Sequence, residues 1–163
     1  HAGCGKETEG SVMIDNTFTL ISRIDGEIRR FITEELAKEG ITDIVPSHGA
    51  IIVELMKHGQ LPMNELARHI DRTPQTVTSL VKKLVKSGYV ETGKAPEDNR
   101  VTMAALTDPG ARLAATLCRI SEEIYELQYQ GIPGDEIVVL RSALARMHAN
   151  FAENGFNDTE SMG

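Results

Sequence analysis

The chain has 163 residues, of which 40% are hydrophobic and 25% are charged, the composition of a globular protein with enough apolar material for a core. A formal net charge of −7 argues against a protein that binds polyanions through a generally basic surface. The longest apolar runs, at residues 50–53 and 137–140, are far shorter than a membrane span, which excludes an integral membrane protein.

The two cysteines and the amino-terminal residues predict a reducing compartment. Cys4 and Cys118 provide neither a disulfide framework nor a metal-binding spacing such as Cys-x-x-Cys. Residues 1–10 are polar and contain no apolar stretch, which is not the pattern of a signal peptide. We therefore expect a cytoplasmic protein with reduced thiols.

Three helices are predicted in the first half of the chain. Between residues 14 and 36, apolar side chains recur at steps of three and four, the spacing of one long amphipathic helix. A second helix begins at Pro46 and ends near Gly59, and a short third helix covers residues 63–70. The apolar positions of the first helix are Ile14, Phe18, Ile21, Ile24, Ile28, Phe31, Ile32 and Leu36.

A fourth helix and a β-hairpin follow. Thr73 has the side chain of an N-cap and Pro74 suits the first helical position, while Gly88 suits the end of the helix. Residues 89–92 and 100–106 have the pattern of strands, and the polar loop between them predicts a hairpin.

Two long helices complete the predicted order, one opened by Thr107-Asp108-Pro109 and one that follows residues 131–134. The order predicts a mostly α-helical fold with a small β-hairpin wing. Because the outer helices carry more apolar surface than they can bury alone, we expect them to form a dimer interface. The predicted parts are a winged helix–turn–helix domain over residues 41–106, dimerisation helices over 14–40 and 107–152, and flexible tails over 1–13 and 153–163.

The fourth predicted helix presents a polar face that suits the major groove of DNA. Glutamine pairs with adenine, hydroxyls contact bases or phosphates, and lysines neutralise phosphates. The amino-terminal end of the helix adds free N–H groups and a positive dipole. Helical periodicity turns Gln75, Ser79, Lys82 and Lys86 outward and places Thr76, Thr78 and Lys83 beside them.

The predicted hairpin carries Lys94 and Arg100 near its tip. An arginine on such a wing suits the minor groove of DNA, where the negative potential is enhanced, and Asp98 is close enough to hold its guanidinium. A structural ion pair of Arg100 with Asp98 or Glu97 is the alternative. A basic helix face alone is most often a solvated surface, but its place between a helix–turn and a hairpin favours DNA binding.

The distribution of charge supports this interpretation. Residues 62–102 hold seven basic and five acidic residues, a net charge of +2, whereas residues 1–61 and 103–163 carry −4 and −5. The acidity therefore belongs to the predicted dimerisation helices. Since +2 is modest, we expect binding that depends on fit at two half-sites rather than on bulk charge.

Five short motifs in this order resemble the MarR (multiple antibiotic resistance regulator) family, and the flanking helices extend the resemblance over residues 15–151. The resemblance implies a homodimeric, ligand-responsive transcriptional regulator whose fourth helix enters the major groove and whose wing enters the minor groove. The motifs are ELA at 65–67, TVTSLVKKL at 76–84, SGYV at 87–90, PEDNR at 96–100 and LTDPG at 106–110. The DNA-binding residues expected on this basis are Thr73, Gln75, Thr76, Thr78, Ser79, Lys82, Lys83, Lys94, Asp98 and Arg100.

The sequence departs from the family pattern at several of these positions. Ser79 stands where the family often has arginine, Asn99 stands where a second wing arginine is common, and residues 91–93 are not basic. We therefore expect weaker or differently targeted DNA binding. Pro62 replaces the usual Ser or Thr cap and shifts the expected start of the third helix by about one residue.

A pocket for a small-molecule effector is expected among the first, second and fifth helices. Ordinary core packing with a partly exposed His48 is the alternative. Thiol sensing by Cys4 or Cys118 is a second kind of response to consider, whereas scattered histidines without a His-x-x-x-His pair argue against a metal site. The candidate ligand-binding residues are Ile24, Ile28, His48, Ile52 and Met56.

No Gly-rich phosphate loop, nucleophile elbow or HExxH motif is present, so we expect neither an enzyme nor a cofactor. The favoured function is a repressor that binds a pseudo-palindromic operator as a homodimer and is released by a small molecule. The alternatives are a thiol-redox-sensing regulator of the same fold and a winged-helix protein-interaction or dimerisation module that does not bind DNA.

Overall fold

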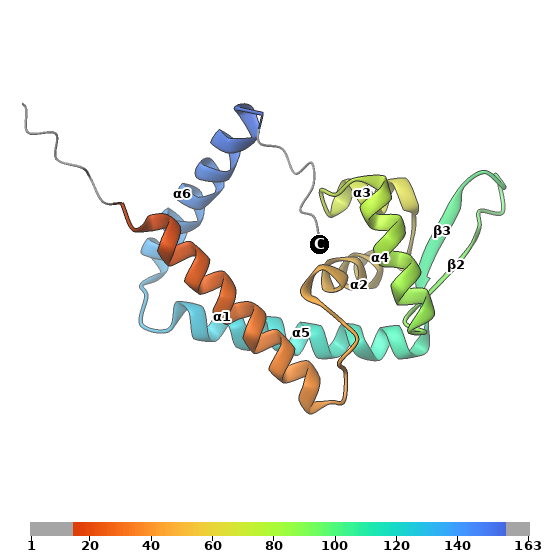
Figure 1. Ribbon diagram of the computed structural model, residues 1–163, viewed down its shortest axis with the longest axis horizontal. Helices are drawn as coiled ribbons and strands as arrows, with labels where there is room; N and C mark the ends of the chain where they lie inside the picture. Colours follow the sequence, from red (N-terminus) through yellow and green to blue (C-terminus); the bar gives the residue numbers. More distant parts are fainter. Residues whose placement is uncertain (1–14, 156–163) are drawn as a thin grey trace, which may run out of the picture.

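The computed structural model describes residues 15–155 (Figure 1). It confirms a mostly helical fold in the predicted order of elements. The predicted tail over residues 1–13, most of the tail over 153–163, and Ile14 and Cys4 lie outside the described residues. The elements are α1 (Thr17–Lys38), α2 (Pro46–His58), β1 (Gln60–Pro62), α3 (Met63–His69), α4 (Pro74–Lys86), β2 (Val90–Lys94), β3 (Thr102–Leu106), α5 (Asp108–Tyr129) and α6 (Gly134–Glu153).

The wing is a three-stranded antiparallel sheet rather than the simple hairpin predicted, with strand order β1-β3-β2. The unpredicted strand β1 pairs Leu61 with Ala104 of β3, while β2 pairs Val90 with Leu106 and Lys94 with Thr102. Three residues are too few to show the alternation that marks a strand, so the sequence did not predict β1. The strand forms through its pairing with β3. The sheet thereby joins the start of α3 to the base of the hairpin.

The core lies where α2 meets α4 and the first half of α5. The apolar faces of these helices are removed from solvent, which stabilises the fold by about 1.5–3 kcal/mol for each large aliphatic side chain. His48 is also buried, at 3% exposure, and is not partly exposed as predicted. The core side chains with the least exposure include Ile51, Ile52, Leu55, Val77, Leu84, Leu113 and Ile120.

Helices α1 and α5 cross each other (Figure 1). Arg119 of α5 forms ion pairs that join the two helices. Its guanidinium lies 2.9 Å from Glu39 and 3.4 Å from Glu35 of α1, and 2.5 Å from Glu123 of α5. The Thr116 hydroxyl, together with Arg119, holds the pKa of the Glu39 carboxyl below its ordinary value. The crossing is thus fixed by hydrogen-bonded charges as well as by apolar contacts.

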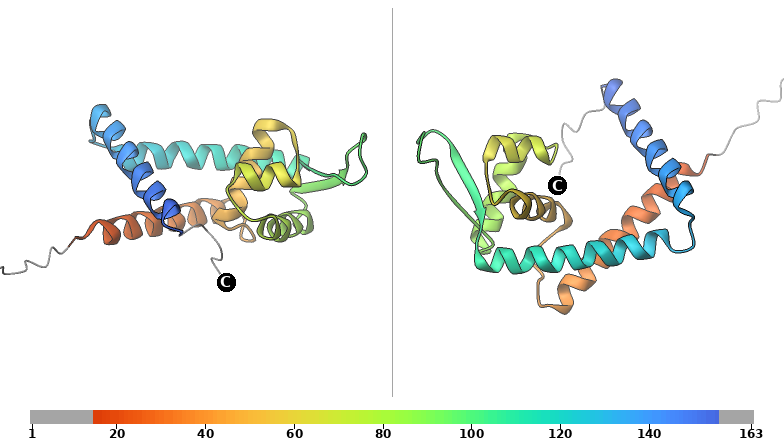
Figure 2. Two further views of the ribbon diagram at one scale, coloured as in Figure 1. Left: turned by 90° about the horizontal axis from the view of Figure 1, so that it is seen from above. Right: turned by 180° about the vertical axis from the view of Figure 1, so that it is seen from behind.

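Helix α6 stands apart from the winged domain and buries none of its residues (Figure 2). It exposes an apolar face that includes Leu140 and Leu144, which are 42% and 40% exposed, and Phe18 in the first half of α1 is 80% exposed. None of the helices in residues 15–155 is long and apolar enough to cross a membrane. These apolar faces are therefore available for contact with another chain.

The start of α5 lies against the chain just before β2. Thr107 caps α5 as predicted, because its hydroxyl accepts from the Gly110 N–H at 3.2 Å, and it also donates to the Gly88 carbonyl at 2.5 Å. A Cβ added at Gly110 would lie 1.9 Å from the carbonyl oxygen of Tyr89. Glycine at position 110 therefore allows the fifth helix to approach the wing this closely.

We expect Gly110→Ala to lower the free energy of unfolding by about 3 kcal/mol, because backbone must move to admit the methyl group. Gly26→Ala is the matched control, since a Cβ at this helical position in α1 has no neighbour within 4 Å. It should raise the free energy by about 1 kcal/mol through helix propensity. Chemical denaturation followed by circular dichroism measures both, and a Gly110 variant as stable as the parent would contradict the close approach.

Candidate nucleic-acid interface

Helix α4 begins as the sequence predicts. The Thr73 hydroxyl accepts from the backbone N–H of Thr76 at 3.3 Å, and Pro74 occupies the first helical position. Pro74 has no N–H and the Val77 N–H donates to the Thr73 carbonyl at 3.0 Å, so the Gln75 N–H is the group of the first turn left to bind a phosphate oxygen. The amino-terminal end of α4 is therefore held firmly and keeps its capacity to bind an anion.

The two faces of α4 divide as predicted. Val77, Val81 and Leu84 are buried in the core, while the predicted DNA-facing side chains of α4 are all exposed. Those exposed side chains are Gln75, Thr76, Thr78, Ser79, Lys82, Lys83 and Lys86.

Some exposed side chains of α4 already form hydrogen bonds within the chain, and others do not. The Thr78 hydroxyl donates to the Pro74 carbonyl at 2.8 Å, and the Thr73 and Thr76 hydroxyls lie 2.9 Å apart. In contrast, Gln75 and Lys82 make no hydrogen bond or ion pair with any residue in 15–155. The free amide and ammonium groups are therefore better placed to read bases and bind phosphates than the threonines.

The β2–β3 hairpin projects beyond α4 at the end of the molecule opposite α6 (Figures 1 and 2). Lys94 donates to the Thr102 hydroxyl at 3.2 Å across the hairpin. Asp98 accepts from the backbone N–H of Arg100 at 2.9 Å, and so does not hold the guanidinium as predicted. The reason is the two-residue spacing, which in a tight turn brings an aspartate onto the backbone.

The Arg100 guanidinium makes no hydrogen bond or ion pair with any residue in 15–155. It forms no ion pair with Asp98 or Glu97 within the part of the chain that the structure describes, so the predicted structural alternative is also absent there. The turn that Asp98 fixes presents this cation at the tip of the wing.

The five candidate ligand-binding residues do not share one cavity. Ile24 and Ile28 line a pocket of about 370 Å³ between α1 and α5. Ile52 is fully buried in the core, and the Nδ1 atom of His48 accepts from the Val45 N–H at 3.2 Å while its Nε2 atom has no partner among the described residues. Burial lowers the pKa of His48, so this histidine is a neutral core residue.

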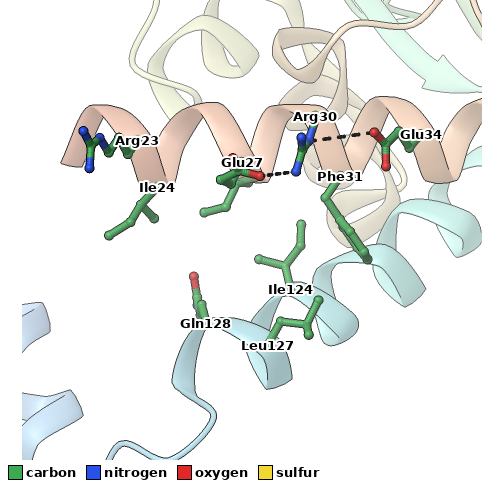
Figure 3. Close-up of a pocket in the computed structure, with 10 residues that line it drawn as sticks. Arg23, Ile24, Glu27, Arg30, Phe31, Glu34, Ile124, Leu127 and Gln128 are labelled. Carbon is green, nitrogen blue, oxygen red and sulfur yellow. Dashed lines mark hydrogen bonds and ion pairs between the residues drawn. The ribbon is translucent and has the colours of Figure 1, made fainter. Parts of the chain in front are cut away.

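The pocket between α1 and α5 is mainly apolar (Figure 3). Ile24 and Phe31 point from α1 toward Ile124 and Leu127 of α5, and Arg30 pairs with Glu27 and Glu34 along α1. Phe31, Ile124 and Leu127 were missed as lining residues, although helical spacing already placed Phe31 on the same face as Ile24 and Ile28. The pocket suits a small apolar or aromatic molecule.

A second pocket of about 330 Å³ lies among α1, α2 and α5. Ile32, Val53 and Leu117 contribute to its apolar wall, and Glu54 and His69 reach its edge. Met56 lies outside both pockets, where its sulfur accepts from the half-buried Cys118 thiol at 3.6 Å. The thiol-sensing alternative stays a prediction.

Comparison with known proteins identifies the fold and a family that the chain resembles. A MarR family model matches residues 40–100. The HTH-type transcriptional repressor IacR of Pseudomonas putida is 22% identical over 80% of this chain and 76% of its own length.

Two solved structures share the fold. The S. aureus MepR–DNA complex has a TM-score of 0.73 at 22% identity and covers 82% of this chain and 97% of MepR. A mutant MarR from E. coli in complex with operator DNA has a TM-score of 0.68 at 20% identity, and the match covers 80% of this chain and 91% of the MarR chain. These relatives are regulators and not enzymes, in agreement with the sequence. Over residues 40–100 the chain is therefore similar to the MarR family, and it shares the fold of these two solved structures.

Proposed function

We propose that the chain is a homodimeric repressor that binds a pseudo-palindromic operator and is released by a small-molecule effector. The observation that carries this proposal is the pairing of an exposed polar face on α4 with a projecting wing whose Arg100 guanidinium is free. Gln75 would read a base in the major groove, Lys82 and Lys83 would bind phosphates, and Arg100 would enter the minor groove. The structures of MepR and MarR in complex with DNA support this use of the fold.

The exposed apolar faces of α6 and of the first half of α1 support a dimer. Phe18 is 80% exposed, and Leu140 and Leu144, one turn apart on α6, are 42% and 40% exposed. Burial of apolar surface stabilises an interface by roughly 25 cal/mol per Å². A two-fold axis through these helices would present two copies of α4 to one face of DNA. Recognition helices about 34 Å apart then match one helical turn.

The pocket between α1 and α5 supports effector control. It lies between a proposed dimerisation helix and the helix that carries the winged domain. A molecule bound there favours one crossing angle of α1 and α5, and so changes the spacing of the two recognition helices. DNA is released because only one spacing fits both grooves. The similarity to IacR, a transcriptional repressor, supports repression rather than activation.

We expect Arg100→Ala to weaken binding to a DNA fragment selected from a random pool by at least about tenfold, since each subunit loses a minor-groove cation. The dependence of log affinity on log salt should also become shallower. Arg29→Ala is the matched control, because it removes an equal charge from α1, where Arg29 pairs with Asp25 at 2.7 Å. Fluorescence anisotropy measures both, and equal losses for the two variants would contradict the role of the wing.

Gln75→Ala should separate base reading from phosphate binding. We expect it to reduce affinity for the selected fragment by about tenfold or more and to leave affinity for random DNA unchanged. Lys82→Ala should weaken both by a similar factor. If Gln75→Ala weakens both fragments equally, Gln75 is not a base reader. If the parent binds no DNA at low salt yet sediments as a dimer, the chain is a protein-interaction module.

A further inference from the structure

Three side chains with metal-ligating atoms meet at the ends of α2 and α3. Glu54 and His58 lie one turn apart on α2, and His69 comes from the last turn of α3. The Glu54 Oε2 atom is 3.1 Å from His69 Nδ1 and 3.5 Å from His58 Nε2. The three ligand atoms all lie within 4.8 Å of one another, although Glu54 and His69 are 15 residues apart in the sequence.

These separations are close to those around a tetrahedral zinc ion. Zinc binds imidazole nitrogen and carboxylate oxygen at about 2.0–2.1 Å, which places adjacent ligand atoms about 3.3 Å apart. Both separations from the Glu54 oxygen, 3.1 and 3.5 Å, bracket that value. The centroids of the two imidazole rings are 4.9 Å apart. A side-chain rotation would aim both rings at one ion, and His58, which is 43% exposed, has room to make it.

The surroundings prepare Glu54 to act as a ligand. Lys57 donates to its other oxygen, Oε1, at 2.9 Å, which leaves Oε2 facing the two histidines. Both histidines are partly exposed, so a metal ion can reach the site from solvent.

We propose that Glu54, His58 and His69 bind one Zn²⁺ ion per chain, with a water molecule or another ligand in the fourth position. The ion joins the end of α2 to the end of α3, immediately before the turn at Asp71 that leads into α4. The absence of His-x-x-x-His argued against a metal site in the sequence. Glu54-x-x-x-His58 has the same one-turn spacing, and the third ligand is supplied by the packing of α3 on α2.

The test is titration of the full-length chain with ZnCl₂ in competition with a chromophoric chelator. We expect one site per chain, with an affinity that falls by more than about 100-fold in His58→Gln and in His69→Gln, since loss of a direct ligand exceeds the effect of losing its supporting contacts. His148→Gln is the matched control, because it removes an exposed histidine from α6. It should bind zinc like the parent, as should a variant with both Cys4→Ser and Cys118→Ser.

Thermal unfolding gives an independent readout. ZnCl₂ should raise the Tm of the parent and of the control variants, and should leave the Tm of His58→Gln and His69→Gln unchanged, because only a site in the native state stabilises it. Circular dichroism without zinc confirms that the variants are folded. The proposal is overturned if the parent binds no zinc, if the two histidine variants bind it as tightly as the parent, or if the cysteine variant loses it.

Discussion

The position of α4 relative to the outer helices depends on α5, a single uninterrupted helix of 22 residues. Its first half packs under the winged domain through Leu113 and Leu117, and its second half crosses α1 at Arg119. The close approach of Gly110 to Tyr89 fixes the start of the same helix against the wing. Because a helix transmits a rotation along its length, the wing, α4 and the crossing with α1 are mechanically linked.

This link explains how the proposed functions fit together. The apolar faces of α1 and α6 would hold two chains about one axis, and α5 would carry each winged domain to a fixed distance from that axis. The pocket lined by Phe31 and Ile124 lies at the α1–α5 crossing, where a bound molecule would have the greatest effect on that distance. The proposed zinc site lies within the winged domain, between α2 and α3. It would restrain these two helices relative to each other.

Local chemistry made much of this structure predictable. Thr73, Pro74 and Thr107 identify the starts of α4 and α5, because capping depends on residues within one turn. Features that depend on tertiary contact were missed. Strand β1 exists through its pairing with β3, and the burial of His48 reflects packing against elements that its own helix does not reveal.

In the candidate site, too, local features were predictable and tertiary contacts were not. Helical periodicity predicted the exposed face of α4 correctly, whereas the predicted contact of Asp98 with the Arg100 guanidinium was wrong, because the Asp98 carboxylate accepts from a backbone N–H in the turn. The meeting of Glu54 with His69 was not predictable either, since it requires the packing of α3 on α2. Periodicity therefore predicts which side chains face outward, but not which partners they find.

In the proposed complex, two chains read one DNA site through two copies of α4 and the wing. Sedimentation of the chain with a fluorescent fragment selected from random DNA, combined with a footprint of the same complex, measures both the number of chains and the spacing of their contacts. We expect two chains per fragment and two protected half-sites with centres about 34 Å apart. One chain per fragment, or a single protected segment without an internal repeat, would contradict this proposal.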